Sequence, residues 1–445
     1  MVTCPTCHGS IDTAVVKHVV ASHRVNDRSQ LPVAQQAYGS HMDKERRHMF
    51  ELEGKYNKAK VFADKLEEGA IEQIVTFCNQ PHSKGSRIRI MPDAHQGAGS
   101  TIGTTMTVTD TVVPNLVGVD IGCGLSVAIV KINPADLSFD RVDDVIRRYI
   151  PSGFSTQPPN RLHRFSKLVK YRDIKAPIDL ERAKASIGTL GGGNHFIEIN
   201  AYDEEHIAVV VHSGSRNLGK RIAEFHQGRA YDELIAQRDT HAAIVAQRKK
   251  DGDQEDVQST LQARPKQAIP KELAYLKGES FADYLNDMTI AQHYAELNRQ
   301  AMLETLLAQM NWTAVDAFST IHNYIDMDNM ILRKGAISAQ KDERVIIPLN
   351  MRDGSIIAYG KGNEDWNYSA PHGAGRLMSR TKAKKLVVLA DFKETMKEVW
   401  SSSVKLSTLD ESPMAYKPMD EIIEQIKETV TIDRIIKPLY NFKAN

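Results

Sequence analysis

The chain has 445 residues, which is enough for one large domain or two to three ordinary domains with a substantial buried core. Its 25% charged and 41% hydrophobic residues are ordinary for a soluble globular protein, and a net charge of +1 argues neither for nor against nucleic acid. No run of about 18 apolar residues occurs, and no apolar signal-peptide core begins the chain, so we expect neither a membrane span nor secretion. The cysteines are too few for a disulfide framework, which favours a reduced, cytoplasmic protein.

The beginning of the chain has the residues of a small zinc site. Two thiols are followed by two imidazoles at a spacing that can close a tetrahedral site, at Cys4, Cys7, His18 and His23. Residues 1–24 are therefore predicted to form a C2H2-like zinc finger that binds Zn²⁺. The alternative is a flexible arm with unpaired thiols.

A polar segment separates this predicted finger from the rest of the chain. Residues 25–42 are interpreted as a linker. Within it, Gly39–Met42 resembles a remnant of cloning, which would make Met42 a natural start.

From residue 43 to residue 445 the chain is predicted to form one large α+β domain. The apolar spacing of Val61–Cys78 is typical of an amphipathic helix. Strands are predicted for segments rich in β-branched residues, namely Thr105–Val113, Leu116–Ile121, Ile207–Val211, Arg344–Leu349 and Ile356–Tyr359.

A long helix is predicted in the second half of the chain. Apolar residues recur near a helical period from Phe281 to Met302, so the helix is expected to continue through Met310. Residues 247–272 are polar and indicate an exposed excursion between two helices. Because strands and helices do not alternate in βαβ order, we expect mixed sheets and not a doubly wound one.

Two segments offer metal ligands beside glycines. Asp120 and Cys123 lie three residues apart in a glycine-flanked segment, so both side chains can reach one ion or bridge two. A buried Cys beside a capping Asp is the alternative. The run Gly191–Gly193 leads into Asn194 and His195. Because ordering three glycines costs much conformational entropy, a plain structural turn would hardly need them, and we expect a ligand to approach the backbone closely there.

Two further histidines follow apolar runs. His212 and His322 occur where strands are expected to end, although a lone histidine in that position is more often a core or turn residue. Together the candidates supply one carboxylate, one thiolate and three imidazoles. A thiolate can bridge two ions, with an Asp–His pair completing one site and a His–His pair the other.

His372 lies in a segment of small residues, Ala370–Arg376. An imidazole next to glycine-rich backbone can approach a phosphate without obstruction, and backbone N–H groups with Arg376 could hold the charge. Beside the upstream metal ligands, this motif indicates covalent nucleotidyl chemistry by His372.

These segments together resemble the RtcB tRNA-splicing ligase family of GTP-dependent RNA ligases. The resemblance extends from about Met42 to Asn445 and is carried, in order, by Met91–Gly97, Val119–Gly124, Gly188–Glu198, His212–Gly219, Arg333–Ala336, His372–Lys385 and Pro413–Lys417.

The resemblance implies roles for individual residues. Two Mn²⁺ ions would be held by Asp120, Cys123, His195, His212 and His322, with Cys123 bridging them, and His372 would be guanylylated. The guanylate pocket would be formed by Asn194, His195, Phe196, Glu198, His322, Asn323, Pro348, Asn350, Met351, Ser355, Gly373, Ala374, Gly375, Arg376, Tyr416 and Lys443. Ligand chemistry alone would favour Zn²⁺ over Mn²⁺, so the assignment of manganese comes from the resemblance.

One segment departs from the family pattern. The family commonly has Pro-Gly-Ser-Met-Gly where this chain has Pro348–Arg352, so Leu349 and Arg352 replace glycines and are expected to reshape the pocket wall. The family also usually ends at Lys-Gly, whereas Lys443 is followed here by Ala444 and Asn445.

The resemblance further implies the reaction. His372 would take GMP from GTP and pass it to an RNA 3′-phosphate, which a 5′-hydroxyl end then attacks; 2′,3′-cyclic phosphates would first be opened. RNA is expected along basic residues, of which the cluster Lys382–Lys385 is the best candidate. The full set is Arg87, Arg89, Arg216, Arg376, Arg380, Lys382, Lys384 and Lys385.

Two alternatives stay open at this point. The departure around Asn350 motivates a nucleotidyltransferase or RNA end-processing enzyme without efficient strand joining. A nucleic-acid-binding adaptor, with a functional zinc finger and a degenerate ligase domain, is the second. We expect a cytoplasmic monomer, with an archease-like activator as a further partner.

Overall fold

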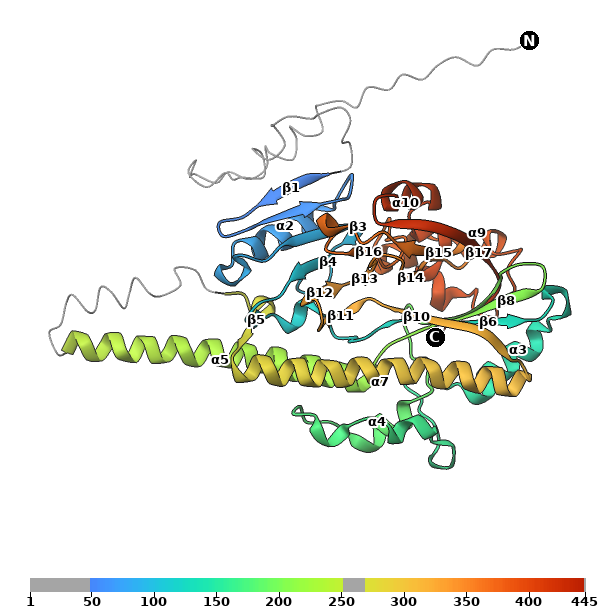
Figure 1. Cartoon of the computed structure of the whole chain (residues 1–445), viewed down its shortest axis with the longest axis horizontal. Helices are drawn as coiled ribbons and strands as arrows, with labels where there is room; N and C mark the ends of the chain where they lie inside the picture. The colour runs from blue at the N-terminus through green and yellow to red at the C-terminus, as the bar shows by residue number, and fades with distance from the viewer. Residues whose placement is uncertain (1–48, 251–268, 444–445) are drawn as a thin grey trace, which may run out of the picture. The chain divides into compact units, whose positions relative to one another are not determined.

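Two sheets carry most of the segments singled out in the sequence (Figure 1). The computed structural model describes residues 49–250 and 269–443, which belong to a single unit, Lys44–Asn445. These described residues form one large domain of helices and mixed sheets, as the α+β prediction requires. The predicted finger residues Cys4, Cys7, His18 and His23 and the linker 25–42 lie outside the described residues.

The first sheet forms from the early strands and a later hairpin. In spatial order its strands are β1 (Phe50–Glu53), β2 (Lys58–Val61), β3 (Ile88–His95), β4 (Ile102–Thr107), β12 (Ile331–Lys334) and β11 (Asn323–Asp326). Only β2 and β3 pair in parallel among these neighbours. This sheet brings the carboxylate of Asp93, on β3, to the same region as the segment that precedes His372.

The second sheet is antiparallel and holds the histidine-bearing strands. Its order is β10 (Ala314–Ile321), β6 (Gly124–Lys131), β8 (His206–Ser213), β7 (Phe196–Ala201), β17 (Val430–Lys443), β15 (Gly354–Gly360) and β14 (Arg344–Asn350). Both faces of its centre are covered, by a cluster around Ile197 and Val209 on one side and by a cluster around Leu125 and Val210 on the other. That burial explains why β6 and β8 are continuous apolar runs and not alternating ones.

Short strands and helices complete the described residues. Two small antiparallel pairs are β13 (Ala336–Ser338) with β16 (Ser369–Pro371) and β5 (Thr111–Val112) with β9 (Leu276–Lys277). The α-helices are α2 (Glu68–Cys78), α3 (Phe139–Tyr149), α4 (Leu180–Ser186), α5 (Arg216–Lys250), α7 (Glu279–Met310), α8 (Arg380–Leu386), α9 (Leu389–Thr395) and α10 (Met419–Ile426). None of the helices in the described ranges is long and apolar enough to cross a membrane.

The helix α7 connects the sheets to the site. It runs beside α5 and packs against β6 and β8 (Figure 1). Two polar side chains on its buried face, Asn298 and Arg299, are fully shielded from solvent. Asn298 accepts hydrogen bonds from the N–H groups of Gly188 and Thr189 at 2.8 and 3.1 Å, and Arg299 donates to the carbonyls of Gly122 and Ser213 at 2.7 and 3.0 Å. A polar core of this kind fixes loop backbone that no sheet ladder holds.

Several predicted elements are confirmed. The long helix corresponds to α7, and the strands predicted at Ile207–Val211, Arg344–Leu349 and Ile356–Tyr359 lie within β8, β14 and β15. On either side of the predicted excursion 247–272, the structure has α5 ending at Lys250 and α7 beginning at Glu279; residues 251–268 lie outside the description.

Other predicted boundaries were wrong. The helix predicted from Val61 begins only at Glu68, because Val61 ends β2. The strand predicted at Leu116–Ile121 does not form: Pro114–Leu116 is a short 3₁₀ turn, and Gly118 has a φ of 96°. Proline fixes its own φ and has no N–H to donate to a neighbouring strand. The apolar residues that follow Pro114 therefore lie in a loop and pack into the core from there.

We predict that Asn298→Ala destabilises the domain strongly. The substitution leaves two buried backbone donors without acceptors, at roughly 1–3 kcal/mol each, so the free energy of unfolding should fall by about 3 kcal/mol. Urea denaturation followed by circular dichroism measures the change. Gln300→Ala, on a more exposed position of the same helix, serves as the control and should change stability little. Equal effects of the two variants would contradict the bracing role of Asn298.

Candidate active site

The five predicted metal ligands converge on one buried sulfur. Cys123 Sγ lies 3.5 Å from His195 Nε2 and 3.4 Å from His212 Nε2. His195 Nε2 is also 3.0 Å from Asp120 Oδ2, and His212 Nε2 is 3.2 Å from His322 Nε2. Segments that are about 200 residues apart in sequence therefore meet here.

The ligand atoms divide into two groups that share Cys123. One group is Asp120, Cys123 and His195, the other is Cys123, His212 and His322, and within each group the ligand atoms lie within 4.8 Å of one another. A carboxylate, a thiolate and imidazoles are the donors that divalent transition metals prefer. The cluster can therefore hold metal, and its geometry fits two ions bridged by the sulfur.

Backbone carbonyls orient two of the imidazoles. His195 Nδ1 lies 2.9 Å from the carbonyl of Leu190, and His212 Nδ1 lies 3.2 Å from the carbonyl of Asn194. An Nδ1–H that donates to a carbonyl leaves the lone pair on Nε2, the atom that faces the cluster. The rings are therefore held in the tautomer that a metal ligand needs.

Burial sets the protonation of the cluster. It lowers the pKa of His212 and of His322 well below the usual value, so both rings are neutral. It also raises the pKa of the Cys123 thiol, with Asp120 adding to the effect. For Asp120 burial favours the protonated form, but the hydrogen bond with His195 and the charges of His195 and Arg216 together outweigh it and lower the pKa. Since a coordinated cation deprotonates a thiol outright, binding of metal and loss of the Cys123 proton are coupled.

Glycines allow the loops to approach this closely. Gly122 has a φ of 70°, and a Cβ there would lie 2.8 Å from the Cα of Gln292 on α7. Gly191 has a φ of 86°, and a Cβ there would lie 1.9 Å from the Arg216 guanidinium. Both positions thus require glycine for conformation and for space.

His372 lies at the edge of the cluster and is held by a buried carboxylate. It follows β16, and its Nδ1 is 2.7 Å from Oδ2 of Asp93, whose side chain is fully buried. Its ring centre is 4.9 Å from that of His322. With Nδ1–H donated to Asp93, the lone pair lies on Nε2, which makes Nε2 the nucleophilic atom.

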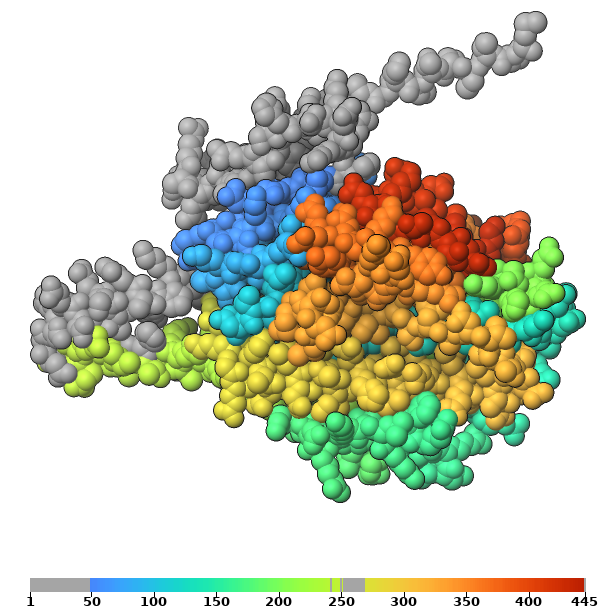
Figure 2. Space-filling view, viewed as in Figure 1, coloured from blue at the N-terminus to red at the C-terminus, as the bar shows by residue number. Residues whose placement is uncertain are grey.

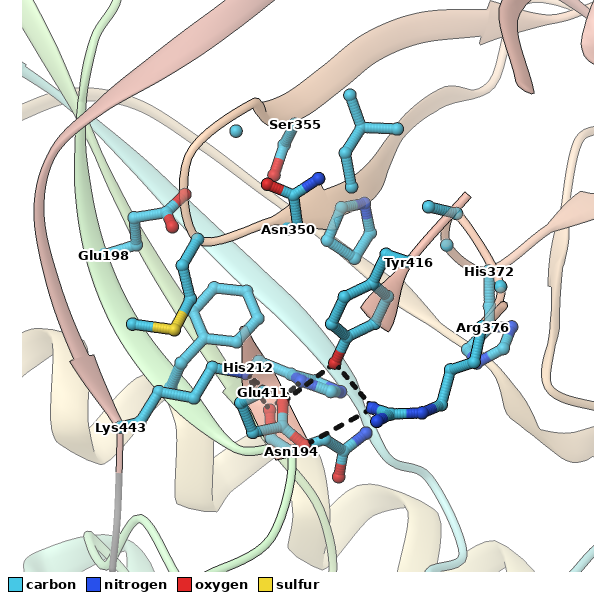
Figure 3. A pocket seen from close by; sticks show the side chains of 18 of the residues that line it. Asn194, Glu198, His212, Asn350, Ser355, His372, Arg376, Glu411, Tyr416 and Lys443 are labelled. Carbon is cyan, nitrogen blue, oxygen red and sulfur yellow. Dashed lines mark hydrogen bonds and ion pairs between the residues drawn. The ribbon is translucent and has the colours of Figure 1, made fainter. Parts of the chain in front are cut away.

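A pocket opens beside His372 (Figure 3). Most of the predicted nucleotide residues line it, namely Asn194, Phe196, Glu198, Pro348, Asn350, Met351, Ser355, Gly373, Ala374, Gly375, Arg376, Tyr416 and Lys443. His195, His322 and Asn323 are not part of its wall. The first two belong to the metal cluster, and Asn323 donates to the carbonyl of Asp120 at 3.2 Å and accepts from the N–H of Gly335 at 2.9 Å.

A buried carboxylate connects several groups of the pocket. Glu411 lies 2.5 Å from Lys443 Nζ and accepts from the Tyr416 hydroxyl at 2.9 Å (Figure 3). Arg376 donates to the same hydroxyl at 3.1 Å, and Arg380 lies 3.6 Å from Glu411. Burial of Glu411 favours its protonated form, but Lys443 and the two arginines lower its pKa. The network holds three cations at one end of the pocket.

The other end of the pocket presents buried polar atoms without partners. Glu198 accepts from Asn441 at 2.7 Å through one oxygen, while its second oxygen, the Asn441 carbonyl oxygen and the Ser355 hydroxyl have no partner in the structure. Burial raises the pKa of Glu198 to about 7. Buried polar groups are normally satisfied, so this end is suited to a ligand with several donors and acceptors on one edge.

Of the segment that departs from the family pattern, Pro348–Met351 line the pocket and Arg352 does not. Arg352 donates to Asp353 at 2.7 and 2.9 Å and does not line the pocket. Asn350 accepts from the N–H groups of Arg352 and Asp353 and so caps its own turn. Leu349, on β14, lines the pocket, as the sequence predicted, and its buried side chain packs in the cluster that includes Ile347 and Ile356.

Some predicted RNA-contacting residues are engaged in ion pairs within the fold. Arg87 donates to Glu364 at 2.8 Å, and Arg89 donates to Asp365 at 3.2 Å. Lys384, on α8, lies 3.5 Å from Asp410. Arg380 lies on the same helix and is half-exposed. Of these predicted residues, it is the best placed to contact an RNA strand at the pocket.

Sequence reasoning did not assign five side chains to the pocket region, namely Asp93, His95, Arg380, Glu411 and Asn441. Signals in the sequence existed for two of them. Asp93 lies in the conspicuous segment Met91–Gly97, where polar residues interrupt a strand. Asn441 lies two residues before Lys443 on β17 and so shares its face of the sheet.

An α+β domain in which a buried Asp/Cys/His cluster able to hold metal lies beside a carboxylate-held histidine and a polar pocket has the features expected of a metal-dependent enzyme. The chain matches the family described as tRNA-splicing ligase RtcB over residues 73–178 and 169–444. It is 31% identical over 409 residues to the RNA-splicing ligase RtcB of Escherichia coli strain K12, covering 82% of this chain and 92% of that relative. It is also 24% identical over 443 residues to the tRNA-splicing ligase RtcB of Nanoarchaeum equitans, covering 78% of this chain and 85% of that relative. The chain therefore belongs to the RtcB family of RNA ligases.

We predict that Cys123 controls the binding of both metal ions. Because its sulfur belongs to both ligand groups, Cys123→Ala should reduce bound Mn²⁺ from two ions per chain to fewer than one, whereas His322→Ala should leave about one. Elemental analysis after equilibrium dialysis measures the stoichiometry. Cys78→Ala removes a buried free thiol of α2 and should keep both ions. Retention of both ions by Cys123→Ala would contradict the bridging geometry.

We predict that Glu198 makes the stability of the metal-free protein depend on pH. Its folded pKa of about 7 exceeds the value of 4.5 for a free carboxyl, so between these pH values the unfolded chain releases a proton that the folded protein keeps. Stability is therefore lost as the pH rises through this window and levels off above it. Glu198→Gln removes the effect, so its stability relative to the wild type should rise by about 3 kcal/mol between pH 4.5 and pH 8.

Thermal and urea denaturation at several pH values measure this difference. Glu204→Gln, at an exposed position, should show a difference that does not change with pH. A constant difference for Glu198→Gln would show that Glu198 stays ionised in the folded protein.

Proposed function

We propose that the chain joins RNA 3′-phosphate or 2′,3′-cyclic phosphate ends to 5′-hydroxyl ends, using GTP and Mn²⁺, through a guanylylated His372. The observation that carries this proposal is the position of His372 between a buried carboxylate and the shared-sulfur cluster. With Nδ1 held by Asp93, the ring has its lone pair on Nε2, the atom that would attack phosphorus. His372 belongs to neither of the two ligand groups. The names of the relatives support RNA ligation as the overall reaction.

In the first step, His372 Nε2 attacks the α-phosphorus of GTP. A nitrogen–phosphorus bond forms, the bond to the bridging oxygen breaks, and pyrophosphate leaves. Asp93 keeps the ring oriented and stabilises the positive charge that develops on it, as a carboxylate does for other catalytic histidines. Asp120, Cys123, His195, His212 and His322 would hold two Mn²⁺ ions, which when bound neutralise charge on phosphate oxygens.

The pocket supports a guanine nucleotide as the donor. Glu198 is suited to accept from the N1–H and N2–H₂ groups of guanine, and its unpartnered oxygen is available for this purpose. Lys443 is suited to donate toward O6 or N7. The two arginines near Glu411, Arg376 and Arg380, would lie near phosphate or ribose groups, where positive charge is favourable.

In the second step, an oxygen of the RNA 3′-phosphate attacks the phosphorus bound to His372. The nitrogen–phosphorus bond breaks, and the RNA end now carries GMP through a pyrophosphate bond. The 5′-hydroxyl then attacks the RNA phosphorus, loses its proton to solvent or a base, and expels GMP. GMP is a better leaving group than the oxide of an unactivated 3′-phosphate. Attachment of GMP therefore makes formation of the phosphodiester bond possible.

The chemistry of the cluster also bears on where the reaction takes place. The cluster needs Cys123 as a free thiol, which is compatible with the reducing cytoplasm. We propose that the protein acts as a monomer, and that an archease-like activator accelerates guanylylation. Splicing of tRNA and repair of cleaved RNA are the processes that supply such ends.

The structure bears on the alternative of end-processing without joining. That alternative was motivated by two bulky residues, Leu349 and Arg352, where the family has glycines. Because Arg352 is paired with Asp353, it does not obstruct the pocket. We therefore favour the joining reaction, and one assay separates the two.

Incubation with GTP labelled at the α-phosphate tests the first step, and RNA fragments test the whole reaction. With Mn²⁺, the wild type should form an acid-labile adduct and join a 3′-phosphate fragment to a 5′-hydroxyl fragment. His372→Ala should form no adduct and should reduce joining by more than 1,000-fold, because no covalent intermediate forms. Asp93→Asn should slow guanylylation by about 100-fold while leaving GTP binding unchanged, since the ring loses its orienting carboxylate.

The control is His293→Ala, an exposed histidine on α7, which should behave as the wild type. Guanylylation with no joined strand would establish the end-processing alternative. An adduct that persists in His372→Ala would contradict the assignment of the nucleophile.

A further inference from the structure

Phe154 is exposed to an extent that folding alone does not explain. Its side chain is 94% exposed, whereas the next most exposed large apolar side chain in the described ranges, Leu406, is 68% exposed. A phenyl ring in water gains nothing for stability, because burial is what makes an aromatic side chain favourable. Phe154 is therefore available to a ligand.

The segment that carries Phe154 is attached to the metal-binding region. The N–H of Gly153 donates to the carbonyl of Gly191 at 2.8 Å, and the N–H of Leu190 donates to the carbonyl of Pro151 at 2.9 Å. The carbonyl of Leu190 is also the group that orients His195. Three hydrogen bonds thus connect the turn of Phe154 to a ligand of the cluster.

Two guanidinium groups adjoin the same glycine run. Arg216 donates to the carbonyl of Gly153 at 3.2 Å, and its guanidinium occupies the space where a Cβ of Gly191 would lie. Arg380 lies 3.3 Å from the corresponding Cβ position of Gly193. An exposed aromatic ring and two arginines are therefore joined by one short backbone segment that leads to His195.

This combination matches single-stranded nucleic acid better than a protein. Protein-docking surfaces are contiguous apolar patches, whereas the residues next to Phe154 are Gly153 and Ser155, with arginines beyond them. Proteins that hold single strands combine positive charge along the backbone with aromatic side chains on which bases stack.

We propose that Phe154 stacks on an unpaired base of the RNA substrate close to its reacting end, while Arg216 and Arg380 contact neighbouring phosphates. This inference rests on the proposed RNA-joining function and adds a positioning residue to it. Stacking of this kind accepts any base, because every base has an aromatic face. Phe154 would thus align the strand end with His195 and its neighbours without imposing a sequence.

Substitution of Phe154 tests the proposal without threatening the fold, because the side chain buries almost nothing. Phe154→Ala should weaken binding of a 3′-phosphate RNA oligonucleotide by about 10-fold in fluorescence anisotropy, in the range expected for one stacked base. It should raise the KM for RNA by a similar factor and leave the formation of the His372 adduct with GTP unchanged. Phe154→Trp should retain binding, whereas Phe154→Leu, apolar but without an aromatic face, should not.

Tyr359→Ala provides a matched control, since Tyr359 is an aromatic residue of β15 that is 40% exposed. It should leave RNA affinity unchanged. Abasic sites placed singly along the 3′-phosphate strand and along the 5′-hydroxyl strand then locate the contact. At the stacked position, an abasic site should weaken the wild type by about 10-fold and Phe154→Ala hardly at all.

Unchanged RNA affinity of Phe154→Ala would overturn the proposal. So would abasic sites that weaken the wild type and Phe154→Ala equally at every position. Loss of binding by Phe154→Leu and Phe154→Trp alike would also count against stacking. Because anisotropy needs no GTP, a failure of the proposed ligase reaction would be seen separately, as a missing His372 adduct in the wild type.

Discussion

The position of one buried sulfur atom constrains the whole site. Cys123 Sγ contacts imidazoles from two neighbouring strands and belongs to both ligand groups, so no ligand can move without disturbing the others. In the metal-free state, burial and Asp120 hold the proton on this sulfur. Metal binding removes that proton, which links occupancy of the cluster to its charge.

The surrounding fold keeps this sulfur in place through polar contacts as well as packing. The antiparallel pairs of β6 with β8 and β7 with β8 align the strand ends, and Arg299 of α7 ties the loop before β6 to the end of β8. Burial of a guanidinium costs free energy unless the group is hydrogen bonded. Loss of either carbonyl partner of Arg299 would therefore destabilise the fold. These contacts attach the active-site loops to the sheet.

The metal-ligand cluster and the polar pocket meet at His372 because two sheets meet there. Asp93 comes from the first sheet, whereas Glu198 and Lys443 come from the second, on paired strands β7 and β17. The pocket has cations around Glu411 at one end and unpartnered polar atoms around Glu198 at the other. In the proposed function, this polarity would give the nucleotide a defined direction, with its phosphates beside His372.

Local sequence determined the long helix α7, the apolar strands of the second sheet, and the set of residue types able to bind metal. These depend on periodicity and on side-chain chemistry, which short segments contain. It did not determine the loop at Leu116–Ile121, where Pro114 prevents a strand, nor the use of Arg87 and Arg89 in ion pairs. Only the tertiary structure decided that the five predicted ligands converge on Cys123, that Asp93 holds His372, and that Asn323 braces a loop. These are contacts between residues far apart in the chain, and the packing of both sheets against α7 brings them together.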